Sequence, residues 1–300
     1  MRLELRPRRC AAVLGGVLAA ALLTATGAHA SSAAGPGTVV RSLSPGDHLV
    51  TLTVGHLSRS LIVHVPPRSP VANRPLLLIY HGKGDTAQKT ETQETDFAGV
   101  ADQTGEVVAF LQGYANSWNE QAGSSTPAAM AHVNDVAYTT AVIAKLERLV
   151  TFDHKRIVAV GFSNGALMVE DLGCKLASEL AMIVPVEGEL AASTAPRCHP
   201  SRPIAVYEVH GTSDTAIYYD GGPILGRGTV VLSAPRSIAR WAQLDHCGAR
   251  PATSHVSPSI KLTTYTGCRN HEVVVLRTII GGVHQWGSGI GEIVHSVLPR

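Results

Sequence analysis

The chain has 300 residues and a nearly balanced charge, with 25 Lys and Arg against 23 Asp and Glu. A formal net charge of +2 gives no sign of the basic surface that binds nucleic acid or an anionic membrane. We therefore expect neither partner. The length is typical of one large domain that follows a short N-terminal segment.

The first thirty residues predict a secretory signal peptide. Four arginines precede an apolar run over residues 11–23, and a small-residue cleavage site follows at Ala28-His29-Ala30. We expect cleavage after Ala30 and export from the cell, by the general secretory or the twin-arginine route. Residues 31–45 are rich in Ser, Gly and Pro and predict a flexible lead-in to one catalytic domain over residues 46–300.

Apolar runs alternate with amphipathic segments along this domain. Residues 48–54 and 59–65 predict a hairpin, and further strands are expected at residues 76–80, 107–111, 157–162, 182–186, 204–209 and 271–279. Helices are expected at residues 95–104, 133–150, 166–177, 237–243 and 292–298. Strands that alternate with helices predict an α/β fold, with a mostly parallel, twisted sheet covered by helices on both faces.

A short motif, Gly161-Phe162-Ser163-Asn164-Gly165, lies between a strand pattern and a helix pattern. A strand, a sharp turn and a helix around G-x-S-x-G form the setting in which a serine becomes a nucleophile. A simple glycine-bounded turn is the alternative. We take Ser163 as the candidate nucleophile because an acid and a histidine follow it in the required order.

The candidate acid and base each follow an apolar run. Asp214 lies in a Gly-Thr-Ser-Asp loop after residues 203–209, and His284 follows a β-branched run and a glycine pair. In open α/β sheets, functional groups collect outside the carboxyl ends of the strands. An imidazole can take the serine proton, and a carboxylate can fix the tautomer of that imidazole. We choose Asp214 and His284 for these roles, with Asp220 as the rival acid.

The segment His81-Gly82-Lys83-Gly84 ends another predicted strand. Its position fits the loop that supplies one backbone N–H to an oxyanion hole, and we assign the two donors to Lys83 and Asn164. A phosphate loop is excluded because the spacing G-x-x-x-x-G-K-[ST] is absent. We place Trp118 and Trp286 at the substrate, since flat aromatic faces suit rings, and core packing is the alternative for both. His81 is also expected at the substrate.

Four cysteines follow the predicted signal peptide: Cys174, Cys198, Cys247 and Cys268. An even number in an exported chain predicts disulfides. Three pairings are possible, and we favour the two that are local in sequence, Cys174–Cys198 and Cys247–Cys268. We expect no metal, because C-x-x-C and H-E-x-x-H are absent, and no cofactor.

Together, the motifs resemble the secreted polyhydroxybutyrate depolymerase and feruloyl or acetyl-xylan esterase group of α/β-hydrolases. The resemblance extends over residues 71–286 and includes the segments 117–119, 133–136, 161–166, 210–214 and 281–286. It implies the α/β-hydrolase fold without a large cap domain and a triad of Ser163, Asp214 and His284. It favours Asp214 over Asp220, and it departs from the group at Asn134, where an acid is usual.

We therefore expect a secreted serine esterase that acts on feruloyl or acetyl esters of xylan through an acyl-enzyme. A depolymerase of polyhydroxybutyrate or related short-chain esters is one alternative, and a serine peptidase is another. A secreted binding protein without turnover is the alternative from a different class. The partner is the ester substrate, and we expect a monomer or weak oligomer.

Overall fold

The computed structural model describes residues 43–67 and 74–299. The predicted signal peptide and most of the predicted lead-in lie outside these residues. Within the described residues, no helix has both the length and the apolar character that a membrane crossing requires.

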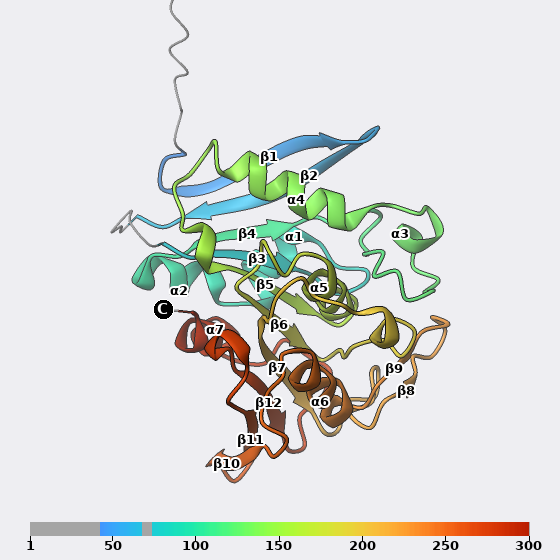
Figure 1. Ribbon diagram of the computed structural model, residues 1–300. Coiled ribbons are helices and arrows are strands. Elements are labelled where there is room, and N and C mark those ends of the chain that lie inside the picture. The colour runs from blue at the N-terminus through green and yellow to red at the C-terminus, as the bar shows by residue number, and fades with distance from the viewer. Residues whose placement is uncertain (1–42, 68–73, 300) are drawn as a thin grey trace, which may run out of the picture. The chain divides into compact units, whose positions relative to one another are not determined.

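One ten-stranded sheet organises the described chain, in the order β1-β2-β4-β3-β5-β6-β7-β12-β11-β10 (Figure 1). Its strands are β1 (Gly46–Val54), β2 (Leu57–Val65), β3 (Leu76–Tyr80), β4 (Val107–Leu111), β5 (Ile157–Phe162), β6 (Met182–Val186), β7 (Ala205–Gly211), β10 (Ala252–Ser257), β11 (Ile260–Tyr265) and β12 (Val274–Ile279). The strands from β4 to β12 along this order are parallel, and antiparallel pairs extend the sheet at both edges. The predicted α/β fold with a mostly parallel sheet is confirmed.

Helices cover both faces of the sheet (Figure 1). They are α1 (Ala87–Lys89), α2 (Phe97–Thr104), α3 (Pro127–Met130), α4 (Asp135–Leu146), α5 (Asn164–Lys175), α6 (Ala234–Leu244) and α7 (Ile290–Val297), with a π-helical turn at Thr90–Glu94 and 3₁₀ turns at His154–Arg156, Ala195–Arg197 and Arg269–His271. Apolar side chains of α4, α5 and α6 join one core cluster, and those of α2 and α7 join a second.

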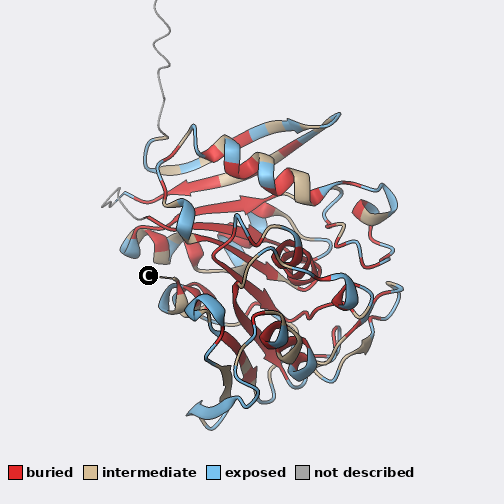
Figure 2. Cartoon of the chain, in the orientation of Figure 1, coloured by how far each residue is buried: buried red, intermediate tan, exposed pale blue. Residues whose placement is uncertain are grey.

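The central strands are buried along almost their whole length (Figure 2). Every residue of β3, β4 and β6 is buried. Strands that are covered on both faces need apolar side chains at consecutive positions, because both sides of the pleat face a core. This explains why their boundaries could be predicted from short apolar runs.

Two β elements were not predicted. The hairpin β10–β11 extends one edge of the sheet, and β8 (Gly222–Pro223) pairs with β9 (Val230–Val231) in a separate small sheet. Residues of β10 are mostly exposed and those of β11 are half-buried. The hairpin therefore lacks the apolar alternation on which strand prediction depends.

Both favoured disulfides are present. Cys174, at the end of α5, is bonded to Cys198, and Cys247, after α6, is bonded to Cys268. The bridges join residues 24 and 21 positions apart. Each closes a loop worth about 3 kcal/mol in the chain-entropy account of disulfide stabilisation.

Candidate active site

The turn between β5 and α5 holds Ser163 in a strained backbone conformation. Its φ of 55° and ψ of −115° lie outside the regions that side chains with a Cβ normally adopt. A Cβ at Gly161 would lie 2.1 Å from the carbonyl oxygen of Gly165, and one at Gly165 would lie 2.1 Å from that of Tyr80. Only glycine fits these two positions, so the sequence of the motif follows from the tightness of the turn.

The acid loop after β7 brings Asp214 to His284. Oδ2 of Asp214 lies 2.6 Å from Nδ1 of His284. Oδ1 accepts hydrogen bonds from the backbone N–H groups of Ala216, at 2.7 Å, and Ile217, at 2.9 Å. The rival Asp220 is exposed, whereas Asp214 is 3% exposed. The structure thus places Asp214, and not Asp220, beside the predicted histidine.

The carboxyl group of Asp214 is held in its ionised form. Burial by itself would raise the pKa of Asp214, but hydrogen bonds from His210, His284 and the Ile217 backbone outweigh burial and hold that pKa well below its usual range. An ionised acceptor fixes the proton of His284 on Nδ1, which leaves Nε2 free to act as a base.

The loops that carry Ser163, His284 and Gly82 converge. The ring of Phe162, directly before Ser163, has its centroid 4.8 Å from that of His284. A Cβ built on Gly82 would lie 3.6 Å from the Cβ of Ser163. The three strand ends of β3, β5 and β12 therefore bring the predicted nucleophile, base and oxyanion loop to one place.

The predicted oxyanion donors occupy suitable backbone positions. Asn164 is the first residue of α5, where N–H groups have no partner within the helix and the helix dipole favours negative charge. Lys83 follows Gly82 with its side chain exposed, and the N–H of Gly84 donates to the carbonyl oxygen of Asn116 at 2.7 Å. This bond fixes the Lys83–Gly84 peptide, and the preceding peptide, which carries the N–H of Lys83, is held through the carbonyl oxygen of Gly82, which lies 2.7 Å from Nδ1 of His81.

His81 supports this loop from within, and the prediction that its side chain contacts substrate is wrong. The side chain is buried, with an exposed fraction of 1%. Nδ1 donates to the carbonyl oxygen of Gly82 at 2.7 Å, and Nε2 accepts from the N–H of Gly113 at 3.0 Å. Burial lowers the pKa of His81, in keeping with an imidazole that uses one nitrogen as donor and the other as acceptor.

Trp118 also packs in the core, which corrects its predicted place at the substrate. It is fully buried, and its indole N–H donates to the carbonyl oxygen of His81 at 2.8 Å. Its ring contacts that of Tyr80, with centroids 5.0 Å apart. The backbone N–H of Trp118 donates to Oδ1 of Asn164 at 2.8 Å, so Trp118 joins the oxyanion loop to the start of α5.

Trp286 ends the segment that carries His284, and its side chain packs against other aromatic rings. It is 5% exposed, and its ring stacks on that of Phe162 with centroids 5.3 Å apart. The ring of Phe97 meets it edge-on at 6.1 Å. Core packing, the alternative for both tryptophans, describes their positions in this structure.

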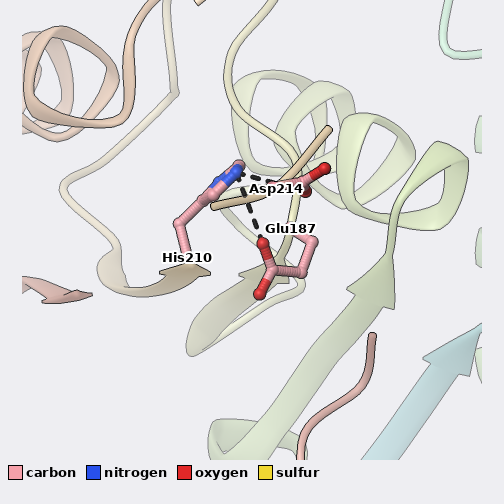
Figure 3. Close-up of side chains that lie close together, drawn as sticks. All are labelled: Glu187, His210 and Asp214. Atoms are coloured by element: carbon pink, nitrogen blue, oxygen red, sulfur yellow. Dashed lines mark ion pairs between the residues drawn. The ribbon is translucent and has the colours of Figure 1, made fainter. Parts of the chain in front are cut away.

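A buried group of ionisable residues behind Asp214 was not predicted. Figure 3 shows three of its members, Glu187, His210 and Asp214, and Glu189 and Glu208 complete it. Burial raises the pKa of Glu187 to about 8 and that of Glu189 to about 7. The sequence carried one signal of this group, because Glu208 and His210 interrupt an otherwise apolar strand.

The chemistry of these residues also suits a metal ion. Ligand atoms of Glu187, His210 and Asp214 lie within 4.8 Å of one another, and so do those of Glu189, Glu208 and His210. On the first side, however, Nε2 of His210 donates to the carbonyl oxygen of Ile217 at 3.0 Å. A nitrogen that carries a proton has no lone pair for a metal, so the first group does not fit one.

The sheet order, the strained serine turn and the Asp–His pair define an α/β-hydrolase fold. An acetyl xylan esterase from Aspergillus awamori has the same fold, with a TM-score of 0.57 over 83% of this chain and 98% of that one, at 13% identity. No protein-family profile matches the sequence.

Esterases are also found among the relatives in sequence. The chain is 31% identical to feruloyl esterase B of Piromyces equi over 72% of its own length, and it spans 40% of that protein. It is 27% identical to NocK of Nocardia uniformis subsp. tsuyamanensis, which carries an esterase name, over 79% of this chain and 73% of that one. The predicted resemblance to esterases is therefore confirmed in sequence, and the predicted α/β-hydrolase fold is confirmed in structure.

Proposed function

We propose that this chain is a secreted serine esterase that hydrolyses feruloyl or acetyl esters of plant polysaccharide. The pairing of Asp214 with His284 at 2.6 Å, at the strand ends that also carry Ser163, is the observation on which the proposal rests. The similarity to a feruloyl esterase and to an acetyl xylan esterase supports a carboxylic ester as substrate, with a feruloyl or acetyl group carried by xylan.

The proposed reaction proceeds through an acyl-enzyme. His284 takes the proton from Oγ of Ser163 through Nε2 as that oxygen attacks the ester carbonyl carbon. The C–O bond to the alcohol then breaks, and His284 returns the proton to the leaving alcohol. Water then attacks the acyl carbon while His284 takes a proton from it. The bond from the acyl carbon to Oγ breaks, His284 returns the proton to Oγ, and the carboxylic acid and free Ser163 are released.

Charge develops on the carbonyl oxygen in both steps. The N–H groups of Lys83 and Asn164 are proposed to donate to that oxygen, each contributing about 3 kcal/mol to lowering the barrier. These donors are backbone groups fixed by the loop and the helix, so they need no reorganisation when the charge forms. Asp214 stabilises the imidazolium that His284 becomes.

Replacement of the nucleophile tests the reaction type. We expect Ser163→Ala to lower hydrolysis of p-nitrophenyl acetate by at least about 10⁴-fold, since triad members act as a unit. Circular dichroism should show an unchanged fold, and a fluorophosphonate probe should label the wild type but not the variant. Turnover retained by the variant would contradict the mechanism, and failure to label the wild type would favour a binding protein.

A substrate panel tests the ester class. We expect methyl ferulate or acetylated xylan to be hydrolysed faster than polyhydroxybutyrate or an aminoacyl amide. Preferential release of hydroxybutyrate would instead identify a depolymerase, and preferential amide cleavage a peptidase.

Export is supported by the N-terminal sequence and by the two disulfides, which form in oxidising compartments. Expression of the full chain with N-terminal sequencing of the protein recovered from the medium tests this part. We expect the mature protein to begin at Ser31. Retention of the uncleaved chain within the cell would contradict export.

A further inference from the structure

Two carboxyl groups and an imidazole meet in the core at the end of β7. They belong to Glu189, Glu208 and His210, the Glu189 cluster, and all three residues are fully buried. Glu208 and His210 are two positions apart on β7, so the pleat of the strand turns both side chains to the same face of the sheet. Glu189 follows the end of the neighbouring strand β6. One ligand atom from each of the three lies within 4.8 Å of the other two.

The polar atoms that face one another in this cluster have no hydrogen-bond partner among the described residues. They are both carboxyl oxygens of Glu189, both of Glu208, and Nδ1 of His210. Nδ1 and Oε1 of Glu189 lie 2.9 Å apart, but they are not placed for an N–H···O hydrogen bond. Buried polar groups are nearly always paired, so a group of unpaired atoms at one point in a core indicates a ligand that all of them bind.

The other ring nitrogen of His210 already has its partners, on the side drawn in Figure 3. Nε2 donates to the carbonyl oxygen of Ile217 at 3.0 Å, and Oδ2 of Asp214 lies 3.4 Å from the same nitrogen. In a neutral imidazole, a proton on Nε2 leaves the lone pair on Nδ1, the nitrogen that faces the cluster. Histidines that bind metal ions typically donate their second N–H to a backbone carbonyl or a carboxylate in this way.

We propose that Glu189, Glu208 and His210 bind a divalent transition-metal ion, best matched by zinc, through carboxylate oxygens and Nδ1. Zinc lies about 2.1 Å from a histidine nitrogen or a carboxylate oxygen, so two ligand atoms at right angles around it are about 3.0 Å apart. The 2.9 Å between Nδ1 and Oε1 of Glu189 fits this spacing. An imidazole ligand favours a transition-metal ion over calcium or magnesium, which take oxygen ligands.

The ion would balance the charge of this buried region and join two strand ends. Burial and the carboxyl groups of Glu170 and Glu189 raise the pKa of Glu208 well above its usual value, and a divalent cation supplies the opposite charge that two carboxylates need. Because the site lies in the core between β6 and the start of the acid loop, its role is structural. The proposal is independent of the proposed esterase activity. It replaces the expectation of no metal, which rested on the absence of C-x-x-C and H-E-x-x-H alone.

The metal content of the purified protein tests the site. The full chain is expressed in medium that contains zinc, and the folded protein is dialysed against metal-free buffer and analysed by inductively coupled plasma mass spectrometry. We expect about one zinc per chain in wild type and in Ser163→Ala, because metal binding at a fully buried site is coupled to folding and the ion leaves only when the chain unfolds. Less than about 0.1 zinc per chain, or calcium or magnesium in its place, would overturn the proposal.

Glu208→Gln locates the ion, and Glu187→Gln is its matched control. Each variant replaces a buried carboxylate near His210 by an amide of the same shape, but Glu187 lies on the Nε2 side, where both of its oxygens accept from the N–H of Gly211 at 3.1 and 3.0 Å. We expect Glu208→Gln to keep less than about a tenth of the zinc and Glu187→Gln to keep about one zinc per chain. Zinc retained by Glu208→Gln, or lost equally from both variants, would overturn the proposal.

Two further measurements on wild type decide the matter even if Glu208→Gln does not fold. X-ray absorption at the zinc edge should show one imidazole nitrogen and carboxylate oxygens at about 2.0–2.2 Å, and a sulfur ligand or a shell without imidazole would overturn the site. Refolding with zinc instead of EDTA should raise Tm by about 5 °C, and an equal Tm would contradict a structural ion. If the wild type fails to hydrolyse esters, the proposed function fails while these measurements still decide the metal site.

Discussion

Two His-Gly pairs end parallel strands of this sheet, and their histidines differ in the groups that surround the two ring nitrogens. His81 follows β3 and His210 lies at the end of β7, and both side chains are buried, at 1% and 0% exposed. His81 meets a backbone carbonyl at one nitrogen and a backbone N–H at the other. His210 meets oxygen atoms at both nitrogens. Burial lowers the pKa of His81, whereas the carboxyl groups beside His210 outweigh burial and raise its pKa, so the same dipeptide lies in two different electrostatic settings.

The two loops contribute different groups to the candidate site. The His81 loop presents backbone groups, because the imidazole orders peptides around Gly82 and Gly113. The His210 loop presents an ionisable side chain, because the imidazole faces the acid that orients His284. Substitutions at the two loops should consequently differ in how their effects depend on pH.

The largest effect is expected for Asp214→Asn, which removes the carboxylate that distinguishes the surroundings of His210 from those of His81. A neutral amide no longer fixes the tautomer of His284, so kcat should fall by about 10⁴-fold near neutral pH. Steady-state kinetics measure the loss. The matched control is Asp220→Asn, an exposed acid nearby in sequence, which should keep kcat within twofold; equal losses in the two variants would reassign the acid.

A smaller effect is expected on the free energy of unfolding when His81 or His210 is replaced, and its pH dependence distinguishes the two histidines. The pKa of His81 is lowered by folding, so His81 contributes stability above the unfolded pKa of about 6.5 and loses it as pH falls through the folded pKa. The pKa of His210 is raised, so His210 contributes stability below about pH 6.5 and loses it as pH rises through the folded pKa.

Urea unfolding of His81→Gln and His210→Gln at pH 5 and pH 8, with wild type and variants refolded in EDTA so that no metal contributes, measures this difference. Each substitution should cost about 2 kcal/mol at its worst pH, because a buried hydrogen-bond partner is left unpaired. His81→Gln should cost more at pH 8, and His210→Gln should cost more at pH 5. Costs with the same pH trend would contradict the opposite pKa shifts of the two histidines.

Much of the fold could be predicted because its strands are short and apolar throughout. Strands β3, β4, β5 and β6 occupy the predicted residues, and the strand ends place Asp214 beside His284 as the sequence order suggested. The exposed β10 offered no such signal, because its residues face solvent and do not need to be apolar.

The side-chain roles were harder to predict. Whether His81 and Trp118 face substrate or core depends on partners such as Gly113 and Tyr80, which are distant in sequence. The surroundings of His210 depend likewise on Glu187 and Glu189, which belong to another strand end. Apolar periodicity locates elements, but it gives no information on which polar groups meet across them.

The smallest effect is expected for Lys83→Ala, because only the backbone N–H of this residue is assigned a role and its side chain is exposed. kcat/KM for p-nitrophenyl acetate should stay within about threefold of wild type. Lys83→Pro, which removes the N–H itself, should lower kcat by about 10²- to 10³-fold, the loss typical of one oxyanion donor. A large loss in Lys83→Ala would mean that the His81 loop works through the side chain of Lys83 and not only through its backbone N–H.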